Sequence, residues 1–506
     1  MAGNGMKSLA KDTAIYGLSS IIGRSLNWCL NPFYMYIFAD PSELGKVSSL
    51  YGYTALFMVL LTYGMETGFF RFMNNKGDDP QKVYSTSLIS LGTTSLLFII
   101  FCFCFINPIA SWLKYPDNND HILMMVIIVA LDAFMTIPYA HLRHLKRPKR
   151  FMAVRMIFII SNIIFNLFFL WICPVIYKSN PELIEWFYNP TYGIGYIFLA
   201  NLLSTGIALL LLIPMTMRGL KLWFDNSILK RMLKYSFPLL ILGIAGVVSQ
   251  TVAQLTYPYL FDDPTEAFRQ LGIYTSSLKI AGIITMFIQA FRYAYEPFFF
   301  GKNKEKDNTK SYADAMKYFI LFVLIIFLGI MFYVDIIEYV LTIIGKNYVV
   351  GLSILPIAMM GEILFGIYFN LSVWYKLTDQ TKYGAWFSIL GCILQVLINI
   401  IFVPMYGYMA SAWATLISNL IIVAISYIIG QKYYPIKYDL KSIFLYFSLA
   451  IILFGVSVYI PIENEVLRFT FRSILFIGFI AIIVKRDLPL KQMAIFNRFT
   501  SKKKKE

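Results

Sequence analysis

The stretch FADPSELGKVSSL, residues 38–50, has a partner later in the chain, FDDPTEAFRQLGIYTSSL, residues 261–278. Asp-Pro-Ser-Glu at 40–43 matches Asp-Pro-Thr-Glu at 263–266, and a Leu-Gly pair follows in both, after an insertion in the second. Each stretch follows a long apolar segment, and the two lie six such segments apart. The match therefore predicts two copies of a six-segment unit in the same orientation, as in transporters built from parallel repeats.

The composition of the chain is typical of an integral membrane protein. Apolar residues make up 58% of the 506 residues and charged residues 14%, whereas an average soluble domain is roughly one quarter charged. The mean hydropathy is +0.65. An all-α, polytopic membrane protein is predicted, because the apolar runs are longer than the short alternating strands of a membrane barrel.

About 14 transmembrane helices are predicted, since roughly 20 apolar residues cross a bilayer as a helix. The predicted spans are 12–38, 47–72, 84–106, 121–142, 151–173, 193–215, 235–261, 270–300, 312–334, 349–374, 384–403, 406–430, 442–460 and 466–484. With the repeat, they predict two six-helix lobes followed by two C-terminal helices. The expected units are an N-lobe at 1–220, a C-lobe at 221–435, the last two spans at 436–485 and a basic tail at 486–506.

The positive charges indicate how the chain is oriented. Most of the 44 lysine and arginine residues fall in the termini and the even-numbered loops. Cytoplasmic loops are enriched in these residues, so both termini are predicted to be cytoplasmic. The basic clusters at 141–150 and 501–506 are then expected at anionic lipid headgroups. This distribution argues against nucleic acid as a partner, although the net charge is +16.

The sequence has no pattern that predicts an enzyme. The five cysteines lie in apolar segments and the three histidines lack zinc-ligand spacing, so neither a metal site nor a bound cofactor is expected. The longest loop, at about 174–192, is too short to fold as a domain. A membrane polymerase or ligase would need catalytic residues in a sizeable loop, and that class is therefore disfavoured.

The first predicted span has a polar face with an arginine near its middle. A guanidinium at that depth costs about 2.5 to 3.5 kcal/mol on insertion scales, so this face is expected to look onto a polar interior. Spacings of three and four residues place its members on one side of a helix: Thr13, Gly17, Ser20, Arg24, Asn27 and Asn31. The equivalent span of the second half has a similar but uncharged face: Ser236, Gly243, Gly246, Gln250, Gln254 and Tyr257.

Polar side chains inside the spans supply the candidate site residues. Arginine suits phosphate because its guanidinium makes bidentate, charge-assisted hydrogen bonds, and a carboxylate within a bilayer can carry a proton or Na⁺. The candidates for substrate binding are Arg24, Asn27, Asn31, Gln250, Gln254, Lys279 and Arg292. The candidates for ion coupling are Glu66, Asp132, Glu296 and Glu362, with Na⁺ or H⁺ left open as the ion.

The same charged side chains also have a structural interpretation, in which they pair with one another. Arg24 could bond Asp132 and pin two helices together, and Arg292 could pair with Glu296 four residues on. For Arg71, near the end of the second span, anchoring at the membrane interface is favoured. The sequence does not decide between the functional and the structural interpretation.

Five segments carry a resemblance to a known family. They are KDTAIYGLSSIIGRSLNWCLNPFYMYIF (11–38), LGKVSSLYGYTALFMVLLTYGMETGFFRF (44–72), IPYAHLRHLKRPKRF (137–151), LGIYTSSLKIAGIITMFIQAFRYAYEPFFF (271–300) and YGYMASAWATLISNL (406–420). The chain resembles the polysaccharide and oligosaccharidyl-lipid flippases (Wzx-like) of the multidrug/oligosaccharidyl-lipid/polysaccharide exporter superfamily. The resemblance covers nearly the whole chain.

What the resemblance implies is a V-shaped bundle of two lobes around a cationic central cavity. Such flippases carry undecaprenyl-pyrophosphate-linked oligosaccharides, such as O-antigen units of lipopolysaccharide or capsular repeat units, across the bacterial cytoplasmic (inner) membrane. On this view Arg24 is the first candidate for contact with the pyrophosphate, while the polyprenyl tail stays in lipid. The implied partners are this substrate and membrane lipids, with polysaccharide assembly proteins left open.

Other functions stay open on the sequence alone. A multidrug antiporter of the same superfamily exports organic cations and is expected to have an acidic cavity, whereas Arg24 favours an anionic substrate. A peptidoglycan lipid-precursor flippase is expected to have more cavity arginines on its first two helices, and the second span offers only Arg71. A purely structural scaffold also stays open.

Overall fold

The chain folds as a bundle of long helices in the computed structural model. The structure describes residues 23, 25, 26, 28–75, 77–216, 221–302 and 309–487, and for 293–302 it describes the backbone alone. Thirteen helical segments of this part are long and apolar enough to cross a membrane. They correspond to thirteen of the predicted spans, which confirms the all-α, polytopic fold class. The first predicted span is helical at its described residues up to 37.

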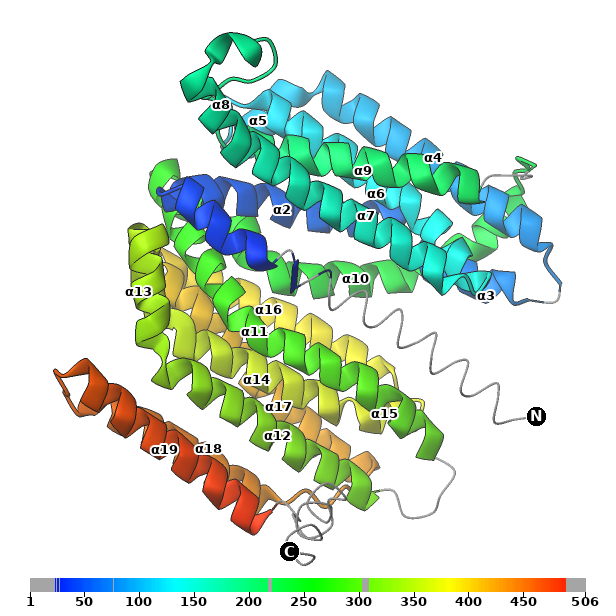
Figure 1. Cartoon of the computed structure of the whole chain (residues 1–506). Coiled ribbons are helices and arrows are strands. Elements are labelled where there is room, and N and C mark those ends of the chain that lie inside the picture. The colour runs from blue at the N-terminus through cyan, green and yellow to red at the C-terminus, as the bar shows by residue number, and fades with distance from the viewer. Residues whose placement is uncertain are drawn as a thin grey trace, which may run out of the picture.

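The helices of the first half gather on one side of the molecule and most of those of the second half on the other (Figure 1). The first half has α2 (Pro41–Thr62), α3 (Met65–Met73), α4 (Pro80–Cys104), α5 (Ile106–Trp112), α6 (Asn119–His144), α7 (Pro148–Leu167), η1 (Phe168–Ile172), α8 (Cys173–Ser179), η2 (Pro181–Leu183) and α9 (Gly195–Thr216). The second half begins with α10 (Asn226–Leu260), α11 (Pro264–Lys302), α12 (Thr309–Phe332), α13 (Val334–Ile344), η3 (Lys346–Ile354), α14 (Leu355–Leu371), α15 (Val373–Leu377), α16 (Lys382–Tyr406) and α17 (Tyr408–Tyr433). It ends with α18 (Leu440–Tyr459) and α19 (Glu465–Arg486).

The matched tetrapeptides of the sequence begin two corresponding helices, α2 and α11. The Asp40 carboxylate accepts a hydrogen bond from the Ser42 backbone N–H at 3.0 Å, and Asp263 accepts one from Thr265 at 2.9 Å. A proline follows each aspartate as the first helical residue. An aspartate cap followed by proline is a preferred start for a helix, because it satisfies or removes donors that would otherwise be free. The matched tetrapeptides therefore have the same local role in both halves, which is to begin a helix.

The two corresponding helices touch through their backbones at one end of the bundle, which we call the glycine end, defined by Gly45, Ser48, Gly272 and Thr275. A β-carbon on Gly45 would lie 1.8 Å from the Phe268 carbonyl oxygen. A β-carbon on Gly272 would lie 1.8 Å from the carbonyl oxygen of residue 41. Ser48 and Thr275 share a hydrogen bond of 2.9 Å across the same contact. Only glycine permits this approach, so α2 and α11 fit together without side chains between them.

The opposite end of the seam between the lobes, which we call the arginine end, is defined by Arg71, Asp78, Arg231 and Tyr235. Arg231 of α10 forms an ion pair with Asp78, which follows α3. The Arg71 guanidinium lies 4.1 Å from the centre of the Tyr235 ring. Between the two ends α10 packs along α2 and α3, so the lobes are in contact at both ends of one seam.

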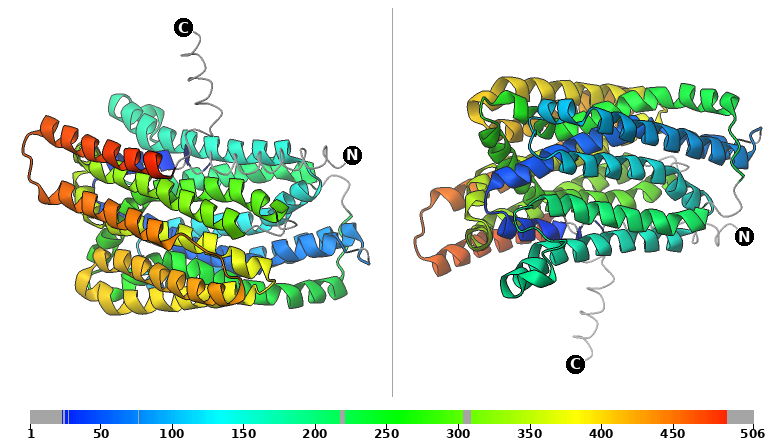
Figure 2. Two further views of the ribbon diagram at one scale, coloured as in Figure 1. Left: turned by 90° about the horizontal axis from the view of Figure 1, so that it is seen from below. Right: turned by 90° about the horizontal axis from the view of Figure 1, so that it is seen from above.

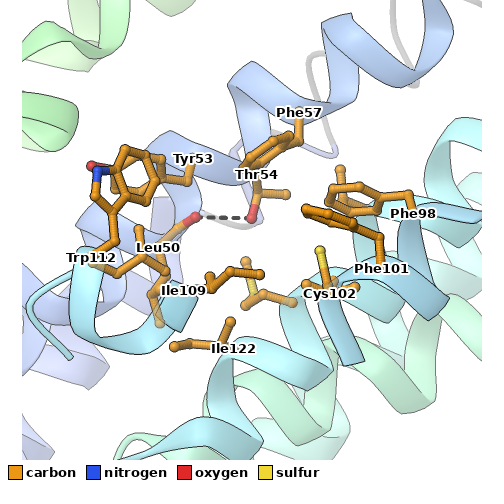
Figure 3. A pocket seen from close by; sticks show the side chains of 14 residues that line it. Leu50, Tyr53, Thr54, Phe57, Phe98, Phe101, Cys102, Ile109, Trp112 and Ile122 are labelled. Atoms are coloured by element: carbon orange, nitrogen blue, oxygen red, sulfur yellow. Dashed lines mark hydrogen bonds between the residues drawn. The ribbon is translucent and has the colours of Figure 1, made fainter. Parts of the chain in front are cut away.

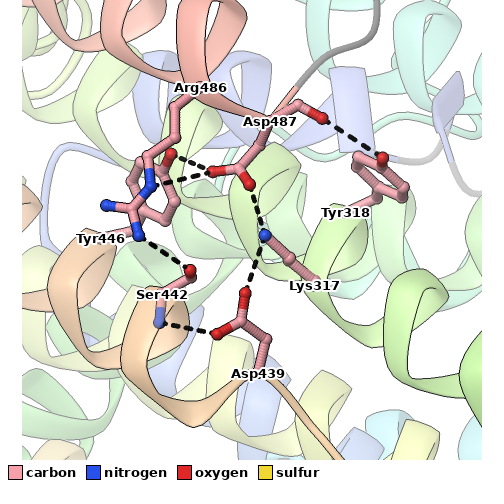
Figure 4. Close-up of polar contacts among 7 residues, drawn as sticks. All are labelled: Lys317, Tyr318, Asp439, Ser442, Tyr446, Arg486 and Asp487. Carbon is pink, nitrogen blue, oxygen red and sulfur yellow. Dashed lines mark hydrogen bonds and ion pairs between the residues drawn. The ribbon is translucent and has the colours of Figure 1, made fainter.

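The last two helices lie against the outer side of the second half (Figures 1 and 2). Near the start of α12, Lys317 binds Asp439 at 2.9 Å and also pairs with Asp487 (Figure 4). At the other end of this helix pair, Arg468 and Arg472 bind the Asp335 carboxylate at 2.8 and 2.7 Å. Two ion clusters thus fasten α18 and α19 to the bundle.

Candidate functional site

A cavity of about 640 Å³ lies between the two lobes, and we call it the central cavity. Helices α2, α7 and α9 of the first half and α10 and α11 of the second half line it, together with the helical residues 28–34. Its polar lining residues are Trp28, Tyr34, Ser48, Tyr51, Asn162, Asn201, Thr251, Gln254, Thr275, Lys279 and Thr285. Hydroxyl and amide groups therefore dominate the polar part of the lining.

Several of these polar groups are held in fixed orientations by hydrogen bonds within the first half. Tyr34 Oη donates to Asn166 Oδ1 at 2.8 Å, and Asn166 Nδ2 donates in turn to the Asn162 carbonyl at 2.8 Å. Asn201 Nδ2 donates to Tyr51 Oη at 2.9 Å. Because amides and hydroxyls both donate and accept hydrogen bonds, such a wall suits a ligand with many hydroxyl groups.

The second half supplies a cation and a free acceptor to the central cavity. Lys279 of α11 is the one charged side chain among the described residues that line it, and its own carbonyl accepts a hydrogen bond from Trp28 Nε1 at 2.6 Å. Gln254 Oε1 of α10 is buried, with no hydrogen-bond partner among the described residues. The described lining thus carries one positive charge, together with an acceptor that a ligand can use.

A second cavity of about 510 Å³ lies inside the first half and borders the central cavity at Tyr51, Phe158 and Asn201. We call it the N-lobe cavity. Its charged lining residues are Glu66, Asp132, Arg143 and Arg155. Glu66 and Arg143 form an ion pair, and the Arg155 guanidinium lies 4.5 Å from the centre of the Tyr139 ring. The formal charges of its two acids and two arginines cancel, so the lining has charged side chains but no net charge.

The structure brings some of the predicted site residues to these cavities. Lys279 and Gln254 line the central cavity, and Asp132 and Glu66 line the N-lobe cavity. Glu362 of α14 lies directly behind the central cavity, where its carboxylate accepts a hydrogen bond from Thr285 Oγ1 at 2.8 Å.

Other predicted site residues lie elsewhere. Asn31 is 4% exposed, and its amide contacts Met35 Sδ at 3.8 Å. Gln250 is exposed and lines neither cavity. The Arg292 guanidinium lies 4.0 Å from the centre of the Phe369 ring. Arg71 lies at the arginine end, away from both cavities, so it does not supply the cavity charge considered for the second span.

Three predicted site residues cannot be placed from the structure. Arg24, Asn27 and the side chain of Glu296 lie outside the described residues. Their predicted roles therefore stay predictions, as do the two proposed pairs, Arg24 with Asp132 and Arg292 with Glu296.

Sequence reasoning missed the hydroxyl and amide groups of the first half, which include Tyr51, Asn162 and Asn201. An asparagine in the middle of an apolar span is a usable signal, because polar groups in a bilayer are costly and need partners. Tyrosines such as Tyr51 gave no such signal, because tyrosine is also common at membrane interfaces and its presence in a span does not indicate a cavity.

Helix α2 separates the central cavity from an apolar pocket of about 360 Å³ (Figure 3). Leu50, Tyr53 and Phe57, at spacings of three and four, face that pocket, whereas Ser48 and Tyr51 face the central cavity. Most of the other residues around the pocket are aromatic or aliphatic, and they come from α4, α5 and α6. The polar cavities, and not this pocket, are the candidate site.

The two lobes with a polar cavity between them, taken together with the comparisons with known proteins, support a membrane flippase or transporter of the multidrug/oligosaccharidyl-lipid/polysaccharide exporter superfamily. Residues 9–301 match the family model described as polysaccharide biosynthesis protein. The chain belongs to that family, as the resemblance predicted. No curated protein matches the chain.

Solved structures share the fold of the whole bundle. The chain is similar to the lipid II flippase MurJ in an inward closed conformation, with a TM-score of 0.70, 16% identity, and 92% of this chain and 98% of that chain covered. It is also similar to an inward-facing multidrug resistance transporter of the MATE family, with a TM-score of 0.62, 14% identity and coverages of 81% and 94%. A third similar structure is a transporter of the same superfamily from Pyrococcus furiosus, with a TM-score of 0.52, 13% identity and coverages of 84% and 95%. At these identities the likeness concerns the fold.

Proposed function

We propose that this protein translocates an undecaprenyl-pyrophosphate-linked oligosaccharide, such as an O-antigen or capsular repeat unit, across the bacterial cytoplasmic membrane by alternating access. In this proposal the sugar lies in the central cavity and the polyprenyl tail stays in the lipid. Both termini lie in the cytoplasm, as the distribution of lysine and arginine predicts.

The observation that carries this proposal is the character of the central cavity. Its described lining combines orienting amides and hydroxyls with the ammonium of Lys279. Sugar hydroxyls can form hydrogen bonds with the amides and hydroxyls, and the ammonium attracts a pyrophosphate. Arg24, from the polar face of the first span, would add a bidentate phosphate contact to the same substrate.

A multidrug cation antiporter is the first alternative, because one similar structure is a multidrug transporter. The charge of the described central lining argues against it, since Lys279 would repel an organic cation. A peptidoglycan lipid-precursor flippase is the second alternative, because another similar structure is the lipid II flippase. The position of Arg71 outside the cavities argues against the arginine-rich cavity expected for that role.

A transport assay in proteoliposomes tests the proposal, with a lipid-linked oligosaccharide, lipid II and an organic cation as the three cargoes. We expect the wild-type protein to transport the lipid-linked oligosaccharide. In Lys279→Gln the rate should fall at least tenfold, because the central cavity loses the positive charge of Lys279. The matched control is Lys432→Gln, which neutralises an exposed lysine at the end of α17. Transport of the organic cation alone would favour the antiporter, and a wild-type rate in Lys279→Gln would remove the proposed role of that residue.

Ion coupling forms a separate part of the proposal. Asp132 and Glu362 are the acids we assign to it, because one lines the N-lobe cavity and the other lies behind the central cavity. Asp132→Asn or Glu362→Gln is expected to flatten the dependence of transport on pH or on Na⁺, whichever drives the cycle. Glu338→Gln, at an exposed acid of α13, serves as the control. An unchanged ion response in both variants would exclude these two acids.

A further inference from the structure

A basic pocket of about 570 Å³ lies at the arginine end, apart from both polar cavities. Its charged lining residues are Arg71 of α3 and Arg231 and Lys234 of α10. These helices belong to different halves of the chain, so the pocket spans the seam between the lobes. Three cations meeting there repel one another unless an anion offsets them.

The described acids offset only one of these three cations. Asp78 pairs with Arg231 and also accepts a hydrogen bond from Asn75 Nδ2 at 2.7 Å. Arg71 and Lys234 have no carboxylate within ion-pair distance among the described residues. The pocket therefore keeps an excess of positive charge.

The two arginines are held ready for a ligand. Arg71 is positioned by its contact with the Tyr235 ring at 4.1 Å, and Arg231 by Asp78 and by the Phe72 ring at 5.4 Å. A planar guanidinium that is already positioned loses little freedom when it binds phosphate.

The surface beside the pocket indicates which molecule carries the anion. Leu233, Phe237 and Ile241 follow on α10 at intervals of four residues, and all three side chains are exposed. They form an apolar track along a helix that crosses the membrane. A headgroup bound at the basic pocket would place its acyl chains along this track, and basic pockets between membrane helices are known to bind anionic headgroups.

We propose that a phosphate group binds between the lobes at Arg71, Arg231 and Lys234, and that an anionic phospholipid of the bilayer carries it. Bound there, the phosphate joins α3 to α10 and stabilises the contact between the lobes at the arginine end. The site is separate from the one assigned to the transported substrate. It makes the stability of this end depend on the lipids around the protein.

The test uses the full-length protein in nanodiscs that contain phosphatidylglycerol or only phosphatidylcholine. Native mass spectrometry counts the phosphatidylglycerol molecules that stay bound. Lys234→Gln is the main variant, because Lys234 has no polar partner among the described residues whose loss would disturb folding. We expect at least a fivefold loss of retained phosphatidylglycerol in Lys234→Gln and more in Arg71→Gln, with wild-type retention in Lys432→Gln.

A second arm of the test separates the two sources of phosphate. Millimolar inorganic phosphate is added to the wild-type protein in detergent, and its melting temperature is recorded. Stabilisation by phosphatidylglycerol but not by inorganic phosphate supports a lipid headgroup, and stabilisation by both supports the phosphate site with free phosphate as a competitor. Equal phosphatidylglycerol retention in wild type, Lys234→Gln and Arg71→Gln would overturn the proposal, as would an equal loss in Lys432→Gln.

Discussion

The two ends of the seam between the lobes hold the lobes together by different means. At the glycine end, the backbones of α2 and α11 meet at Gly45 and Gly272 with no side chain between them. At the arginine end, α3 and α10 pack through buried apolar side chains, such as Phe72 and Met232. Charged side chains add to this contact, with Arg231 on Asp78 and Arg71 on the Tyr235 ring. The contact at the glycine end is set by steric fit, whereas the contact at the arginine end also includes charged groups.

This difference has consequences for a protein that must open each end in turn. Close packing is little affected by salt or pH, but it fails abruptly when one atom is added. Partly exposed ion pairs are weak and respond to salt, pH and nearby anions. We expect the glycine end to behave as a contact that is either fully formed or lost, and the arginine end as one whose strength can be adjusted.

Adding a single carbon at the glycine end should have the largest effect. In Gly45→Ala or Gly272→Ala the new β-carbon would overlap a backbone oxygen, and no side-chain rotation relieves an overlap with backbone. The glycine end is then held open, and transport in proteoliposomes should fall at least tenfold while membrane insertion persists.

The matched control for these variants is Gly246→Ala on α10. A β-carbon there meets no described atom within 4 Å, and alanine favours a helix over glycine by about 1 kcal/mol. Transport at the wild-type rate is expected in this control. Wild-type transport in Gly45→Ala would contradict the steric account of the glycine end.

Removing the acid at the arginine end should have a moderate effect. Asp78→Asn leaves Arg231 without its carboxylate, so the three cations repel one another and the end opens more often. Ser236 is fully buried in the seam, against Gly64 and Gly68. Thiol labelling of Ser236→Cys should therefore become about threefold faster when Asp78→Asn is added. The control is Asp262→Asn, which neutralises an exposed acid near the glycine end and should leave the labelling rate unchanged. Equal labelling rates of Ser236→Cys with and without Asp78→Asn would show that the ion pair between Arg231 and Asp78 does not hold the arginine end closed.

Acid should have the smallest effect, and only at one end. The hydrogen bond from Arg231 lowers the pKa of Asp78 below its usual value, which is about 3.9 in an unfolded chain. The ion pair therefore stabilises the contact above about pH 4 and is lost as pH falls through the lowered pKa of Asp78. A spin-label distance across the arginine end should lengthen over that range, whereas the glycine end and the Asp78→Asn variant should not respond.

The sequence predicted the repeat and the class of protein better than it predicted the site. The match at 40–43 and 263–266 marked the starts of α2 and α11 because helix caps are local chemistry. Long apolar runs located the thirteen membrane helices of the described residues, because the length of an apolar run is also a local property of the chain. These features depend on neighbours in the chain and can be derived without coordinates.

The arrangement of the site depends on contacts between distant segments, which the sequence does not display. Lys279 and Gln254 were selected by their polarity within spans, and the structure places both at the central cavity. Asn201 was missed because its role follows from packing against Tyr51, 150 residues earlier in the chain. Gln250 was selected by helical spacing alone, and it is exposed and lines neither cavity, although Gln254 one turn later lines the central cavity.

We expect the two ends of the seam to open alternately around the central cavity, and a pair of distance measurements can show whether they do. Spin labels at residues 114 and 262 report on the glycine end and labels at 74 and 230 on the arginine end, at exposed positions in a background without the five native cysteines. During turnover in nanodiscs, we expect one distance to lengthen in the states in which the other is short. Two distances that stay fixed, or that lengthen together, would contradict the account.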